Sequence, residues 1–157
     1  MLALANQGLY AQNQQDSLQQ FLNNFYAFKE AQNYQKALQA INKVVNYYAD
    51  ENNYELALKY YKESIPVNQE LNNRKNLKKI YSNIAVLYIN LQQPEEALPY
   101  FERSLAIKQD MNRKKEIVAG LYDVAYTHGL LGEYQKGVDK LLDALGSARK
   151  NNYTKLS

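Results

Sequence analysis

The residue types that usually carry enzyme or metal chemistry are scarce in this sequence. The absence of Cys excludes disulfides, thiolate metal sites and Cys nucleophiles, and His128 is its one histidine. A single histidine cannot build a His-rich zinc site. Asp139 and Asp143 are four residues apart, which is the spacing of neighbours on a helix surface. We therefore predict no catalytic residue, no metal site and no cofactor.

The elements that position the remaining polar side chains repeat every 40 residues. A small residue recurs at Ala57, Ala97 and Gly137, and a weaker copy begins at Ser17 and Leu18. The same shift relates the next aliphatic residues (Leu58, Leu98, Val138), large apolar residues (Tyr61, Phe101, Leu141) and second small residues (Ser64, Ser104, Ala144).

The segments between these copies repeat at the same interval. Ile41, Val44, Val45 and Tyr48 occupy positions i, i+3, i+4 and i+7, the apolar stripe of an amphipathic helix. Equivalent sets are Tyr81, Ile84, Ala85 and Tyr88, and then Leu121, Val124, Ala125 and His128. The repeating unit is therefore a pair of helices, in which we expect a packed, partly buried His128.

The pattern predicts an all-α fold, an α–α superhelix (solenoid) of about seven antiparallel helices. Three full hairpins come after a preceding half unit, and the array occupies residues 14–150. We expect Pro66 to kink its helix or to end the regular part near Ile65. The expected helices are residues 14–31, 34–50, 54–72, 75–91, 94–112, 115–131 and 134–150.

We make a separate prediction for each end of the chain. Residues 1–13 are predicted to be a flexible lead-in or the remnant of a signal peptide, because the residues before Gln12 resemble the end of a leader. The chain would be periplasmic or exported in the second case and cytoplasmic in the first. Residues 151–157 are predicted to begin a further, truncated repeat, which leaves an uncapped end that could self-associate. No apolar stretch is long enough to span a membrane.

These hairpins resemble tetratricopeptide repeats. The matching residues are Tyr81, Ile84, Ala85, Tyr88, Ala97, Phe101 and Ser104 in one unit, and Leu121, Val124, Ala125, Gly132, Tyr134, Leu141 and Ala144 in the next. The unit around Ile41 matches less well, because Val45 replaces a small residue. Its period of 40 residues, longer than the family's usual 34 or so, resembles units of bacterial regulators.

The resemblance implies that the first helix of each pair lines a concave groove. The side chains that it places there are Asn42, Lys43, Asn46, Lys79, Ser82, Asn83, Val86, Tyr122, Asp123 and Tyr126. Asn side chains both donate and accept hydrogen bonds, so they can bind a peptide backbone of any sequence. A solvated face with no partner is the other interpretation of this set.

The resemblance predicts a non-catalytic protein–protein interaction module that binds a peptide or protein segment. The alternative is a sensory or regulatory input domain of a bacterial signalling protein, such as a transcription regulator or a two-component sensor. Basic residues that include Arg74, Lys78 and Arg113 are expected to form one edge. A net charge of only +3, without interleaved stacking aromatics, argues against a nucleic-acid partner.

Overall fold

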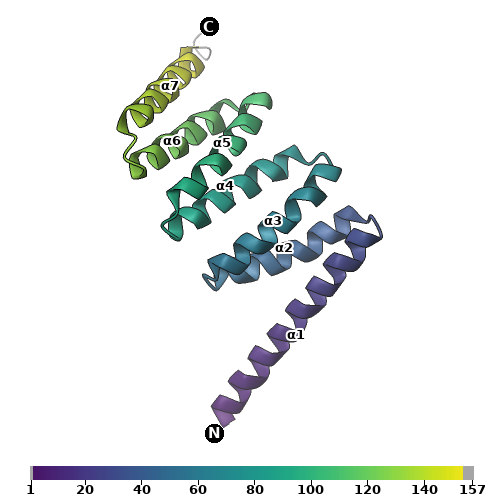
Figure 1. The fold of residues 1–157 in the computed structure, drawn as a ribbon. Coiled ribbons are helices and arrows are strands. Elements are labelled where there is room, and N and C mark those ends of the chain that lie inside the picture. Colours follow the sequence, from purple (N-terminus) through teal and green to yellow (C-terminus); the bar gives the residue numbers. More distant parts are fainter. Residues whose placement is uncertain (1, 154–157) are drawn as a thin grey trace. The chain divides into compact units, whose positions relative to one another are not determined.

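The computed structural model describes the backbone of residues 2–153 and the side chains of residues 12–150, and this part of the chain is helical without a strand. It divides into two units, residues 1–73 and residues 74–157, and each is described by itself. The first unit holds α1–α3 and the second α4–α7 (Figure 1). The helices are α1 (Leu2–Glu30), α2 (Tyr34–Asp50), α3 (Tyr54–Glu70), α4 (Arg74–Asn90), α5 (Pro94–Asp110), α6 (Lys114–Leu130) and α7 (Tyr134–Tyr153).

The five inner helices begin and end within about two residues of the predicted positions. The terminal helices are longer than predicted. The helix α1 already begins at Leu2, and α7 continues to Tyr153, three residues into the segment that is predicted to begin a further repeat. The signal-peptide remnant stays a prediction, and residues 154–157 of the predicted further repeat lie outside the described residues.

A residue in the left-handed backbone region occurs every 20 positions, in each turn between two helices. These residues are Gln32 (φ 54°), Asn52 (55°), Asn72 (48°), Gln92 (58°), Asn112 (50°) and Gly132 (73°). The N–H of the next residue donates to a carbonyl five positions earlier, as from Asn53 to Tyr48 at 2.8 Å. This bond closes a Schellman-type helix end, which explains a compact three-residue link.

Asn occupies several of these turn positions. Asn tolerates the left-handed region better than most residues with a Cβ atom, which accounts for Asn52 and Asn72. The Asn at the next position can cap the next helix: Asn33 accepts from the Lys36 N–H at 3.4 Å and Asn53 from the Leu56 N–H at 3.3 Å. An Asn pair thus ends one helix and begins another.

The core of the first unit lies between α1, α2 and α3. The apolar stripe of α2 buries Ile41, Val44 and Val45 in one cluster with Phe25 of α1 and Val67 of α3. Tyr26 also links α1 to α3, since its hydroxyl donates to Glu63 Oε2 at 2.8 Å. Burial and this bond raise the pKa of the Tyr26 hydroxyl to about 12.

Small residues let the helices of the second unit approach closely. A Cβ atom added to Gly137 of α7 would lie 3.0 Å from the carbonyl oxygen of Ala125 in α6. Ala97 and Ala125 are likewise buried, as the repeat predicts, and Phe101 and Leu105 of α5 fill the neighbouring space. The helices α6 and α7 therefore pack almost backbone to backbone.

Pro66 does not end its helix, so the expected end near Ile65 was wrong, and the alternative of a kink at Pro66 stays a prediction. The helix α3 continues to Glu70, with Pro66 inside it and Val67 and Asn68 fully buried. The Asn68 side-chain amide donates to the Ser64 carbonyl at 2.9 Å. Burial of these two residues and this additional hydrogen bond offset the backbone bond that proline cannot donate.

At the left-handed turn positions, introducing a glycine should stabilise the fold and removing one should destabilise it. Gln92→Gly should raise the free energy of unfolding by about 0.5–1 kcal/mol, because it removes a Cβ from a left-handed residue. Gly132→Ala should lower it by about 1 kcal/mol for the reverse reason. Denaturant unfolding of both variants measures the difference, and the same sign for both changes would contradict this account of the turns.

Candidate functional site

The predicted binding residues divide between the two units. Asn42, Lys43 and Asn46 are exposed on α2 of the first unit. The other seven belong to α4 and α6 of the second unit, where the 40-residue period makes Ser82 equivalent to Tyr122 and Val86 to Tyr126. The candidate site therefore has one part in each unit.

The second unit exposes large apolar side chains at these positions. Tyr122 and Tyr126, one helical turn apart on α6, are 60% and 52% exposed. Val86 on α4 is 48% exposed, whereas its neighbours Ala85 and Leu87 are buried. Lys79 and Asn83 of the same helix are also exposed. These residues form a mixed apolar and polar surface, which we call the second-unit face and define as Lys79, Asn83, Val86, Tyr122, Asp123 and Tyr126.

Ser82 differs from the other predicted residues because its hydroxyl has partners inside the protein. Ser104 Oγ of α5 donates to the Lys78 carbonyl at 2.7 Å and lies 2.8 Å from Ser82 Oγ. Since Ser104 has only one hydroxyl proton, Ser82 must donate in the second bond. Ser82 therefore joins α4 to α5 and has no proton left to donate to a partner.

A group of charged residues lies next to this face and was missed by sequence reasoning. Lys78 was expected on an exposed basic edge, which was wrong: it is buried and forms an ion pair with Glu116 of α6. Lys108 of α5 is also buried, and Asp123 is partly buried near it. The 40-residue period could have found both lysines, because it makes Lys78 equivalent to the buried Leu38 and Lys108 equivalent to the buried Asn68.

Burial controls the electrostatics of this group. It lowers the pKa of Lys108, against the opposing effect of the Asp123 and Glu116 carboxylates. It also raises the pKa of Asp123, and the Lys108 charge opposes that shift. Hydrogen bonds from Lys78 and then Arg113 hold the pKa of Glu116 below its usual range. The two lysines thus bring positive charge close to Glu116 and Asp123, and these two carboxylates balance it.

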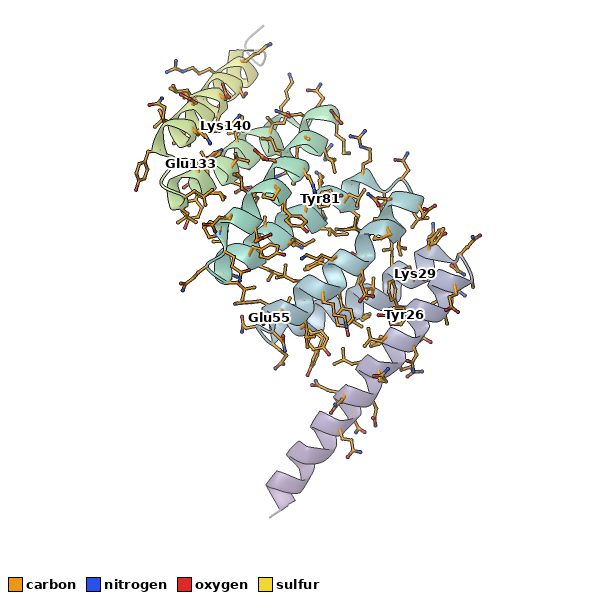
Figure 2. All side chains as sticks on the ribbon, in the orientation of Figure 1. Tyr26, Lys29, Glu55, Tyr81, Glu133 and Lys140 are labelled. Atoms are coloured by element: carbon orange, nitrogen blue, oxygen red, sulfur yellow. The ribbon has the colours of Figure 1, made fainter. Side chains whose placement is uncertain are left out.

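His128 is packed in the hairpin, as expected from its position in the repeat. Its side chain is buried, and Nδ1 lies 2.6 Å from Oε2 of Glu133. Glu133, which Figure 2 labels, lies in the turn before α7. Hydrogen bonds from Lys136 and then His128 lower the pKa of Glu133. His128 therefore helps to hold the α6–α7 turn.

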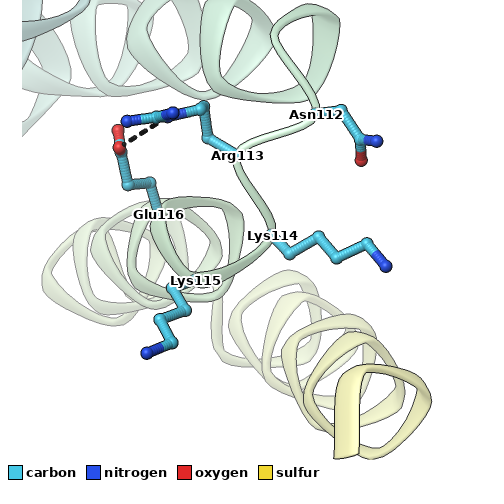
Figure 3. A pocket seen from close by; sticks show the side chains of 5 residues that line it. All are labelled: Asn112, Arg113, Lys114, Lys115 and Glu116. Carbon is cyan, nitrogen blue, oxygen red and sulfur yellow. Dashed lines mark hydrogen bonds and ion pairs between the residues drawn. The ribbon is translucent and has the colours of Figure 1, made fainter. Parts of the chain in front are cut away.

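A shallow cavity of about 320 Å³ lies at the α5–α6 turn (Figure 3). Its lining residues are Asn112, Arg113, Lys114, Lys115 and Glu116. Arg113 Nε donates to Glu116 Oε1 at 3.1 Å, so one of the three cations is already paired.

The described residues include no group of three His, Asp or Glu side chains that could hold a metal ion. No helix within the described residues is both long and apolar enough to cross a membrane.

The bonds of Glu116 predict that the stability lost in the variant Glu116→Gln depends on pH. Because Glu116 has a folded-state pKa below its unfolded value of about 4.3, its bonds stabilise the fold above that pH and are lost on acidification. Glu116→Gln should lower the free energy of unfolding by about 1 kcal/mol at pH 7, after allowance for solvent screening. Denaturant unfolding from pH 7 to 3 measures this cost.

The difference between the wild type and Glu116→Gln should shrink as the pH falls through the folded pKa. Glu102→Gln is the matched control, because Glu102 is an exposed carboxylate of α5. A cost of Glu116→Gln that stays constant from pH 7 to 3, or that Glu102→Gln reproduces, would contradict this role.

Comparison with known proteins identifies the repeat. The model of the tetratricopeptide repeat family matches residues 37–110. No curated protein matches the sequence. Among solved structures, BtubC from P. vanneervenii is 21% identical with a TM-score of 0.66, and the match covers 74% of this chain and 48% of that one.

Two further structures share the fold. Aspartyl phosphate phosphatase F from Bacillus subtilis is 19% identical with a TM-score of 0.69, over 91% of this chain and 38% of that one. A putative kinesin light chain from Podosopora anserina with nearly identical TPR-like repeats is 13% identical with a TM-score of 0.66, over 88% and 68%. This chain spans about half of BtubC and less of the phosphatase. The predicted all-α repeat fold and the predicted resemblance to tetratricopeptide repeats are confirmed, and residues 37–110 match the model of that family.

Proposed function

We propose that this chain is a non-catalytic interaction module that binds a peptide or protein segment on the exposed faces of α2, α4 and α6. The observation that carries the proposal is the pair Tyr122 and Tyr126, each more than half exposed beside the polar groups of α6. The family supports the proposal, because tetratricopeptide repeats are generally scaffolds for protein interactions.

Exposed tyrosines favour a binding face over a merely solvated one. Exposed Tyr rings supply large contact areas at low cost in conformational entropy, and Tyr is enriched among residues that dominate binding energy. Val86 adds apolar area on α4, and the charged groups of Lys79 and Asp123 can set the orientation of a bound segment. A solvated face would need none of these apolar side chains.

The amides of α2 support the same function in the first unit. Asn42 and Asn46 are exposed, and each offers a donor and an acceptor to a peptide backbone. A regulatory input role stays a prediction. The phosphatase whose fold resembles this one is longer, and likeness at 19% identity extends to the fold alone.

The exposed face of α7 supports the predicted self-association. Val138, Leu141, Leu142 and Leu145 are 44–60% exposed, whereas Phe101 and Leu105, the α5 residues equivalent to Leu141 and Leu145, are buried. Four neighbouring apolar residues on one helix form a surface that a second copy could cover. Self-association through this face stays a prediction.

Light scattering over a concentration series tests self-association. The mass per particle should rise with concentration for the wild type, and Leu142→Lys should abolish that rise because it places a charge in the apolar face. The matched control is Leu130→Lys, at an exposed leucine of α6. A constant monomer mass for the wild type would contradict the prediction.

The binding function is tested with peptides selected from a displayed random library by the purified chain. Tyr126→Ala and Tyr122→Ala should each weaken the selected peptides at least tenfold, about 1.4 kcal/mol, because they remove exposed contact area without opening the core. Isothermal titration calorimetry gives the dissociation constants. Circular dichroism confirms that each variant keeps its helices.

Tyr134→Ala is the matched control, since Tyr134 is 72% exposed but lies at the start of α7. Its effect should stay below twofold. Equal losses from Tyr134→Ala and Tyr126→Ala, or no loss from either α6 variant, would reject the second-unit face as the binding surface.

A further inference from the structure

A second apolar surface lies in the first unit, where α1 runs past the end of α2. A cavity of about 310 Å³ opens there, and we call it the α1–α2 groove. Its lining residues are Asn13, Gln14, Ser17, Leu18 and Phe21 of α1, with Lys43 and Tyr47 of α2. Figure 1 shows α1 continuing beyond α2 at this end.

The groove has an apolar floor and a polar rim. Leu18 is buried, and Phe21 and Tyr47 pack against the core cluster of the first unit while staying partly exposed. The rim carries the amides of Asn13 and Gln14 and the hydroxyl of Ser17, which donates to the Asn13 carbonyl at 2.8 Å. This volume is at the small end of ligand-sized pockets, so it fits one large side chain of a peptide.

The charge of the groove is positive. Lys43 is exposed, and the ion pairs among residues 12–150 leave it without a carboxylate partner. None of the lining residues that the structure describes is acidic. Asp16 adjoins Ser17 in sequence, but about 100° of helical rotation per residue turns it away from the lining set.

We propose that the α1–α2 groove binds an acidic peptide segment, with one large apolar side chain on the Leu18, Phe21 and Tyr47 floor and a neighbouring carboxylate at Lys43. The inference rests on the proposed function, because it takes the exposed face of α2 as peptide-binding, and it adds the chemistry of the partner. The apolar side chain supplies most of the affinity and the exposed ion pair supplies selectivity.

Fluorescence anisotropy with a labelled, terminally blocked octapeptide tests the inference. The probe has one phenylalanine between two aspartates in a Gly/Ser background, and two matched probes replace the phenylalanine by serine or both aspartates by asparagine. Loss of the phenylalanine should weaken binding at least tenfold. Loss of the aspartates should weaken it about two- to fivefold, as expected for an exposed ion pair.

Two variants locate this binding in the groove. Ser17→Phe should weaken the acidic probe at least tenfold, because an exposed rim residue then fills the cavity without removing any core atom. In Lys43→Gln the aspartate and asparagine probes should bind equally, and Lys43→Arg should restore the preference. The matched controls are Gln19→Phe, on the opposite side of α1, and Lys115→Gln, an exposed lysine beside the other cavity.

Three results would overturn the inference: no binding of the acidic probe, a preference for aspartate that survives in Lys43→Gln, or undiminished binding by Ser17→Phe. A dimer that Ser17→Phe dissociates would also overturn it, because a second copy would then cover the groove. Tyr126→Ala should bind the acidic probe like the wild type. This variant therefore shows whether loss of binding comes from the second-unit face or from the α1–α2 groove.

Discussion

The structure depends on a residue with a left-handed backbone conformation, which recurs every 20 positions. Each such residue closes one helix and, within two positions, allows the next to begin, so the five inner helices all contain 17 residues. Equal helices joined by equal turns give each hairpin the same internal register. Residues 40 apart therefore occupy equivalent places, and Val86 and Tyr126 are exposed for the same reason.

Close packing explains why the candidate binding residues, and not core residues, face outward from the first helix of each pair. Small residues such as Gly137 bring the paired helices nearly into backbone contact, which leaves room for only one apolar stripe between them. Side chains off that stripe are free to vary. Polar and aromatic residues at those positions, including Asn46 and Tyr122, therefore shape the surface without changing the hairpin.

Periodicity in the sequence predicted the repeated features of the fold and failed where one side chain departs from the repeat. Apolar stripes predicted the inner helices, and the repeat placed His128 in the packed hairpin. The repeat places Lys78 and Lys108 at the positions of the buried Leu38 and Asn68, but it could not show the α6 carboxylates or the space beside Gly120 that accommodate their charges. Nor could it show the groove beside Lys43, which depends on α1 continuing past α2.

Amide chemical-shift mapping of the labelled chain with a library-selected peptide tests the central claim most directly, namely that the partner binds the exposed face of the first helix in each pair. We expect the largest shifts around Val86, Tyr122 and Tyr126, with small shifts along the outer face of α7. Shifts concentrated on Leu141, Leu142 and Leu145, with α4 and α6 unchanged, would contradict the claim.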